Sequence, residues 1–185
     1  VVPSIVLPVG ISFFTFQGLS YVIDVYRNER LKSTRFRDVL LYIALFPQLV
    51  AGPIVRYEDV GDKIKGRRHT LEQLANGLRR FIIGLSKKLL IADVCGSVVT
   101  LIYSAERSVL DSRTAWLAAV CYLIQIYFDF SGYSDMAIGL GLCFGFHFKE
   151  NFNYPYISAS IQEFWRRWHI SLSTWFREYL YIPLG

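Results

Sequence analysis

The sequence predicts an all-α, polytopic membrane protein built from transmembrane, re-entrant and interfacial helices. The first observation is compositional: of the 185 residues, 53% are hydrophobic and 16% aromatic, and the mean hydropathy is +0.32. A soluble domain of this size is rarely so apolar. The second observation is the alternation of long apolar runs with short basic loops. The third is an aromatic and arginine-rich segment at 151–185.

The formal net charge of +5 lies mostly in short loops, a pattern that indicates cytoplasmic loops of a membrane protein rather than nucleic-acid binding. Cys95, Cys121 and Cys143 lie in apolar stretches without CxxC spacing, so we interpret them as small apolar fillers. The chain starts without Met and shows no cleavable signal sequence. We therefore expect an internal fragment whose neighbouring spans are missing at both ends.

The apolar run Ile5–Tyr26 is long enough to span a bilayer. Within it, Gly10 and the polar side chains of Ser12, Thr15 and Gln17 indicate packing against other helices rather than lipid. The basic loop at 27–37 places the C-terminal end of this run on the cytoplasmic side.

The next apolar run, Val39–Val55, is shorter, is interrupted by Pro47 and Pro53, and has basic loops on both sides. A single crossing would put one of these loops outside, against the positive-inside rule. We therefore predict a re-entrant hairpin that enters and leaves by the cytoplasmic face, with its irregular backbone buried in protein or lining a wet cavity.

Two further runs are predicted to cross the bilayer outward and back. Leu74–Tyr103 begins amphipathic and becomes apolar, and the link at 104–113 has no net charge, as expected of an external loop. Thr114–Phe146 returns over 33 residues. Because one crossing needs only about 20 residues, we expect a bent or broken helix here.

The returning run contains two polar residues on one helical face, Gln125 and Asp129, four positions apart. A carboxylate at membrane depth is a candidate functional residue whose usual partners are arginines or a histidine. A structural alternative stays open, in which Asp129 caps a broken helix or pairs with a buried arginine. The glycines of this run permit close helix packing; they are Gly132, Gly139, Gly141 and Gly145.

His169 lies in the aromatic segment. If 162–179 forms one helix, its polar arc contains Gln162, Arg166, His169, Ser173 and Arg177. A neighbouring arc contains Trp165, Trp168, Leu172, Trp175 and Tyr179. This pattern predicts a helix at the bilayer boundary, with His169 facing a polar cavity and able to exchange protons near neutral pH. A purely hydrogen-bonding role for His169 stays open.

The other two histidines are weaker candidates. His69 lies in a basic loop and is expected to be solvated, and His147 is expected to pack at the membrane interface. Because no two histidines have the spacing of metal ligands, we expect no metal site in this chain.

Several segments resemble the membrane-bound O-acyltransferase (MBOAT) family: NFNYPY at 151–156, EFWRRWHISLSTW at 163–175 and REYLYIPLG at 177–185. FPQLVAGPI at 46–54 and YFDFSGYSD at 127–135 are similar to its bacterial branch, which acetylates exported polysaccharides. The similarity runs over nearly the whole chain. It implies that residues 1–185 belong to a single MBOAT membrane domain.

The resemblance implies general-base acyl transfer with His169 as one of two catalytic histidines. The resemblance implies that the second histidine, the essential base, belongs to a Leu-Trp-His-Gly element that this chain does not include. The candidate residues along the substrate channel are Asn151, Asn153, Arg166, Arg167, Ser173, Asp129 and Gln125.

The resemblance also implies the reactants and the location. The donor is acetyl-CoA or another acyl thioester, with no bound cofactor, and the acceptor is an exported polysaccharide such as alginate. Membrane lipid and periplasmic acetylation proteins are the implied partners, and the bacterial inner membrane is the implied location. Two alternatives stay open: a D-alanyl transferase of teichoic acid export, and a non-catalytic membrane component of polysaccharide export.

Overall fold

The computed structural model describes residues 10–33, 35–49, 52–67, 69–106 and 110–185, and every regular element in these ranges is helical. The α-helices are α1 (Ile11–Arg27), α2 (Phe36–Ile43), α3 (Tyr57–Gly66), α4 (Leu71–Ser86), α5 (Asp93–Tyr103), α6 (Ser112–Cys143), α7 (Ile161–Arg167), α8 (Ile170–Phe176) and α9 (Ile182–Leu184). Short 3-10 turns occupy Glu29–Leu31, Phe46–Gln48 and Pro155–Ile157, and π-helical turns occupy Lys87–Ala92 and Arg177–Tyr181.

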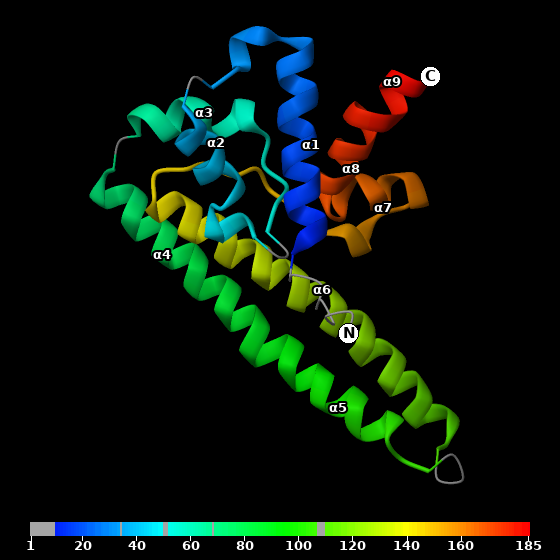
Figure 1. The fold of residues 1–185 in the computed structure, drawn as a ribbon. Coiled ribbons are helices and arrows are strands. Elements are labelled where there is room, and N and C mark those ends of the chain that lie inside the picture. The colour runs from blue at the N-terminus through cyan, green and yellow to red at the C-terminus, as the bar shows by residue number, and fades with distance from the viewer. Residues whose placement is uncertain (1–9, 34, 50–51, 68, 107–109) are drawn as a thin grey trace, which may run out of the picture.

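A long helical hairpin forms the base of the fold. The helices α4 and α5 are joined through the π-helical turn into one rod that lies alongside α6 (Figure 1). Glycines permit their close approach: a Cβ atom on Gly84 would lie 2.5 Å from the carbonyl oxygen of Gly132, and one on Gly139 would lie 2.6 Å from that of Gly77. The predicted packing role of Gly132 and Gly139 is therefore confirmed.

The break expected in Thr114–Phe146 is wrong, because α6 is one α-helix of 32 residues. Its N-terminus is capped by Asp111, whose Oδ1 accepts the Thr114 N–H at 2.8 Å. The irregular turn lies instead in the partner rod, at Lys87–Ala92. Among the described residues, α6 is the one helix with the length and hydropathy to cross a membrane.

The helix α1 packs against the C-terminal helices through a polar stripe. Gln17 and Ser20 are fully buried, the Trp175 indole donates to the Ser20 hydroxyl at 3.1 Å, and the Tyr179 hydroxyl donates to Asp24 at 2.8 Å. The predicted packing is therefore confirmed for Gln17, whereas Ser12 and Thr15, which also suggested it, are exposed. Residues 5–9 of the predicted span lie outside the described residues.

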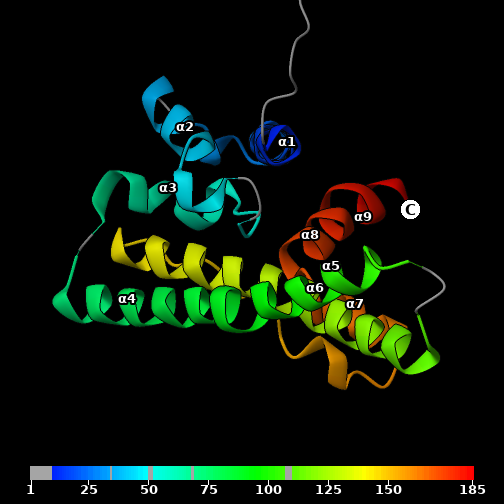
Figure 2. The same cartoon turned by 90° about the horizontal axis from the view of Figure 1, so that it is seen from below.

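The Val39–Val55 run contains no continuous helix in its described part. The helix α2 stops at Ile43, a 3-10 turn follows with Pro47 in its first turn, and residues 52–56 are non-helical before α3. Tyr42, Val60 and Phe146 form the centre of the apolar core beneath it. In Figure 2, α2 and α3 lie together on one side of the α4–α6 hairpin. Entry and exit by the cytoplasmic face stay a prediction.

Candidate functional site

The chain changes direction at His169. The single helix expected over 162–179 is wrong, because α7 ends at Arg167 and α8 begins at Ile170. Between them, His169 adopts the left-handed conformation, with φ 43° and ψ 55°. This conformation costs a non-glycine residue about 1–2 kcal/mol, so surrounding contacts must hold it in place. The His169 side chain is 9% exposed.

Asn151 supplies the contacts that hold this turn. The first N–H groups of a helix have no partner within the helix, and the His169 side chain does not cap α8. Instead, the Ile170 N–H donates to the Asn151 carbonyl oxygen at 2.9 Å, and the Ser171 N–H donates to Asn151 Oδ1 at 3.2 Å. Asn151 therefore caps α8 from a segment that precedes α7.

The same asparagine contacts the imidazole of His169. Asn151 Oδ1 lies 3.1 Å from His169 Nδ1 and accepts the Ser171 hydroxyl at 2.9 Å, while Asn151 Nδ2 donates to Ser134 Oγ at 3.0 Å. The ring of Phe130 packs edge-on against the imidazole, with centroids 4.8 Å apart. Ser134, Asn151, His169 and Ser171 form what we call the His169 network, and its members other than His169 carry no ionisable group.

The environment of His169 favours the neutral imidazole. Burial lowers the pKa of His169 to about 4, and no charged side chain among the described residues shifts this pKa in either direction. The imidazole is therefore neutral near pH 7. A neutral imidazole has one unprotonated nitrogen, which can accept a proton from an approaching hydroxyl.

A large hollow of about 780 Å³ opens beside the His169 network, and Ser134, Asn151 and Asn153 line it. Charged residues on its wall neutralise one another, since Asp135 lies 2.6 Å from both Arg80 and Lys87. The hollow is thus large enough for an extended substrate group and is bounded by the network on one side.

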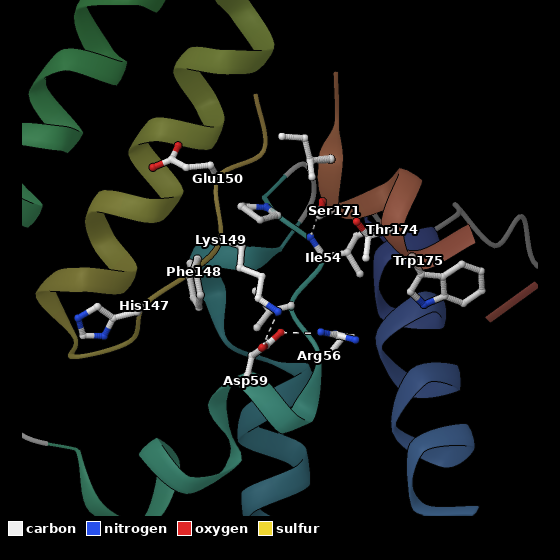
Figure 3. Close-up of a pocket in the computed structure, with 13 residues that line it drawn as sticks. Ile54, Arg56, Asp59, His147, Phe148, Lys149, Glu150, Ser171, Thr174 and Trp175 are labelled. Atoms are coloured by element: carbon white, nitrogen blue, oxygen red, sulfur yellow. Dashed lines mark hydrogen bonds and ion pairs between the residues drawn. The ribbon is translucent and has the colours of Figure 1, made fainter. Parts of the chain in front are cut away.

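A smaller pocket of about 50 Å³ is lined by Ser171 and Ile54 (Figure 3). The Ser171 hydroxyl accepts the Ile54 N–H at 3.0 Å, and Asp59 lies 2.7 Å from Lys149 and 3.5 Å from Arg56. Ser171 therefore connects the His169 network to the non-helical segment that precedes α3.

Arg166 and Ser173 do not share a wall with His169. They line a separate hollow of about 370 Å³, and the Ser173 hydroxyl donates to the Trp165 carbonyl at 3.1 Å. The prediction that all three face one cavity is wrong because the turn at His169 separates α7 from α8. Arg167 has a structural contact: it lies 2.8 Å from Glu163 and donates to the Asn153 carbonyl at 3.2 Å.

Gln125 and Asp129 lie on α6 in the helical hairpin, and within the described residues neither side chain hydrogen-bonds to a member of the His169 network. Asp129 is 2.6 Å from Lys88, and Gln125 packs against Gly96 of α5. Neither structural alternative for Asp129 holds as stated: its partner is Lys88, a lysine with a 38% exposed side chain rather than a buried arginine, and it caps no helix break because α6 is continuous.

The remaining histidines lie outside the network. His69 and His147 are exposed, and His147 Nδ1 lies 3.0 Å from Lys63 Nζ. In the described part of the chain, no group of three or more His, Cys, Asp or Glu side chains is arranged to hold a metal ion.

Sequence reasoning missed Ser134 and Ser171. Both lie inside motifs that carry the family resemblance, at 127–135 and 163–175. Serine is too common for its presence alone to indicate a functional site. The signal that could have found these two residues is their position, because Ser171 is two residues from His169 and Ser134 is beside Asp135.

A protein-family model and several known proteins match this region and most of the chain. The model of the MBOAT, membrane-bound O-acyltransferase family, matches residues 9–185. The chain is 52% identical over its full length to the probable alginate O-acetylase AlgI of Pseudomonas aeruginosa. It is 39% identical over 98% of its length to the peptidoglycan O-acetyltransferase of Helicobacter pylori. It is 32% identical over 94% of its length to the teichoic acid D-alanyltransferase of Bacillus subtilis.

The chain spans only part of each of these relatives. It covers 35% of the Pseudomonas protein, 39% of the Helicobacter protein and 44% of the Bacillus protein.

Proposed function

The chain belongs to the membrane-bound O-acyltransferase family, and on that premise we propose that the whole protein is an O-acetyltransferase of an exported polysaccharide such as alginate. The 52% identity to a probable alginate O-acetylase supports this assignment. The observation that carries it is the buried, neutral His169, held by Asn151 beside a hollow of about 780 Å³. Such a histidine suits proton transfer during acyl transfer.

In the proposed reaction, the acceptor hydroxyl attacks the carbonyl carbon of an acyl thioester, and His169 Nε2 assists by taking the hydroxyl proton. A C–O bond forms, the C–S bond breaks, and the proton then passes to the leaving thiolate. A positioned acid or base of this kind typically contributes about 10²–10⁴-fold to the rate. Amide or basic donors around the carbonyl oxygen would stabilise its developing negative charge.

We further propose a multi-pass protein of the bacterial inner membrane. The basic loops support a cytoplasmic approach of acetyl-CoA or another acyl thioester, and the apolar α6 supports contact with membrane lipid. The acetyl group would then reach the exported polysaccharide with the help of periplasmic partner proteins.

D-Alanyl transfer to teichoic acid is the second candidate. The identity of 32% to a teichoic acid D-alanyltransferase favours it less than the 52% identity favours acetylation. The two differ in the ester formed, so analysis of acetyl and D-alanyl esters on the cell's exported polymers separates them.

The test is His169→Ala in the full-length protein. We expect the acetyl ester content of the polymer to fall by about 10²-fold or more, equivalent to about 2.7 kcal/mol of barrier, at unchanged membrane abundance. His69→Ala, at an exposed histidine in a loop, is the matched control and keeps wild-type acetylation. Wild-type acetylation by His169→Ala at matched abundance would assign His169 a structural role and favour a non-catalytic protein or another base.

A further inference from the structure

We infer that Asn151 is a positioning residue that holds His169 in the tautomer with the proton on Nδ1, so that Nε2 is the free acceptor. The geometric part of this inference depends only on the His169 network. Its consequence for catalysis depends on the function proposed above.

The identity of the Asn151 side-chain atoms follows from their partners. A backbone N–H can only donate, and the Ser171 N–H points at the Asn151 atom that contacts His169. That atom is therefore the amide oxygen, an acceptor without a proton. The other end of the amide, Nδ2, faces Ser134 Oγ at 3.0 Å, and this hydroxyl can accept its proton, so the contact agrees with the assignment. His169 Nδ1 must then be the donor in its contact with Asn151.

The Ser171 hydroxyl is the other group that could reach His169 Nδ1, and it is already engaged. Its oxygen accepts the Ile54 N–H, and its single proton is directed at Asn151 Oδ1 at 2.9 Å rather than at His169 Nδ1 at 3.5 Å. If the Ser171 hydroxyl donated its proton to Nδ1, Nδ1 would be the unprotonated nitrogen and the imidazole proton would lie on Nε2. The shorter distance therefore supports protonation of Nδ1.

Nε2 is the nitrogen left for chemistry. Within the described ranges it makes no hydrogen bond, whereas Nδ1 is tied to Asn151. A neutral amide orients the ring without the charge that would favour imidazolium. Three charged side chains on neighbouring elements have partners: Asp129 pairs with Lys88, Glu150 with Arg80, and Arg167 with Glu163. Arg166 on α7 lines the separate hollow with Ser173.

The direct test is ¹⁵N NMR of the full-length protein labelled at histidine, with the His169 signals assigned by difference from His169→Gln. We expect the Nδ1 signal of a protonated ring nitrogen and the Nε2 signal of an unprotonated one. The reverse pattern overturns the inference. This readout makes no use of acetylation, so its failure is distinct from failure of the proposed function.

Asn151→Asp tests the same contact through activity. The carboxylate can still accept from Nδ1, but it stabilises imidazolium and should raise the pKa of His169 by about 1–3 units. The acidic limb of the pH–rate profile for polymer acetylation should therefore move to higher pH by a similar amount. If His169→Ala has lost acetylation, so that His169 is shown to act in the reaction, an unshifted profile for Asn151→Asp at preserved abundance overturns the inference.

Two controls separate this shift from added charge and from lost stability. Asn76→Asp makes the same substitution at an exposed position of α4, and Tyr42→Phe removes a core hydrogen bond to the Val55 carbonyl. Neither should move the pH profile.

Asn151→Ala, which cannot accept from Nδ1, should lower kcat by about 10-fold or more with a small change in KM. If that variant fails to fold, Asn151→Asp and the NMR measurement still decide the question.

Discussion

The molecule holds polar groups between its helices in two regions that are built in opposite ways. In the α4–α6 hairpin, Asp135 and Asp129 meet the basic side chains of Arg80, Lys87 and Lys88. In the His169 network, an amide, two hydroxyls and a neutral imidazole satisfy one another without formal charge. Each of these five charged side chains in the hairpin has an oppositely charged partner. The network leaves His169 Nε2 without a hydrogen-bond partner among the residues that the structure describes.

This difference supports a structural role for the charge pairs of the hairpin and the proposed chemical role of His169. A carboxylate in an apolar region is costly unless it is paired, so Asp129 and Asp135 are satisfied when they hold two helices together. A neutral network costs less to bury and can keep one acceptor free. The left-handed backbone at His169 adds local strain, which is common at functional sites.

The largest expected effect comes from breaking the charge pairs of the hairpin. Asp135→Asn leaves Arg80 and Lys87 without their shared carboxylate at a position that is 8% exposed, so unfolding in detergent should become easier by about 3–5 kcal/mol. Asp129→Asn is the matched variant; its carboxylate is 48% exposed, and its loss should cost about 0–1 kcal/mol. Equal losses for the two variants would mean that burial does not distinguish these pairs.

A smaller effect is expected from the pH dependence of the network. Burial lowers the pKa of His169 to about 4 in the folded protein, from an ordinary value of 6.5. Between these values the unfolded chain takes up a proton that the folded chain does not, so stability should fall as pH drops from 6.5 toward 4. His169→Gln should remove this part of the slope. Unfolding midpoints measured over this pH range give the comparison, and identical slopes in the two proteins would contradict the neutral, buried histidine.

Helical architecture was largely predictable from the sequence. Apolar runs located α1, the α4–α5 rod and α6, and the glycines at 132 and 139 indicated the close helix contact that the structure has. Each of these features depends on local composition or on short-range periodicity. The same information could not locate the π-helical turn at Lys87–Ala92, because nothing in the residues there departs from an ordinary helical pattern.

The site was only partly predictable, for a physical reason. His169 and Asn151 were identified, but the periodicity of 162–179 placed His169 with Arg166 and Ser173. The turn that separates them is stabilised by Asn151, which lies outside that helical window. Asp129 was a candidate because an unpaired carboxylate in a membrane is unfavourable in free energy. The sequence could not show that it pairs with Lys88, which lies 41 positions earlier. Long-range contacts of this kind are not contained in local patterns.

The most direct measurement compares one variant from each region by acetylation per molecule of membrane-inserted full-length protein. His169→Ala should reduce this rate by about 10²-fold or more, because it removes the proton acceptor. Asp129→Asn should leave it near the wild-type value, because its carboxylate pairs with Lys88 and makes no hydrogen bond to the network within the described residues. A normal rate for His169→Ala together with a lost rate for Asp129→Asn would contradict the assignment of the chemistry to the His169 network and place it in the hairpin.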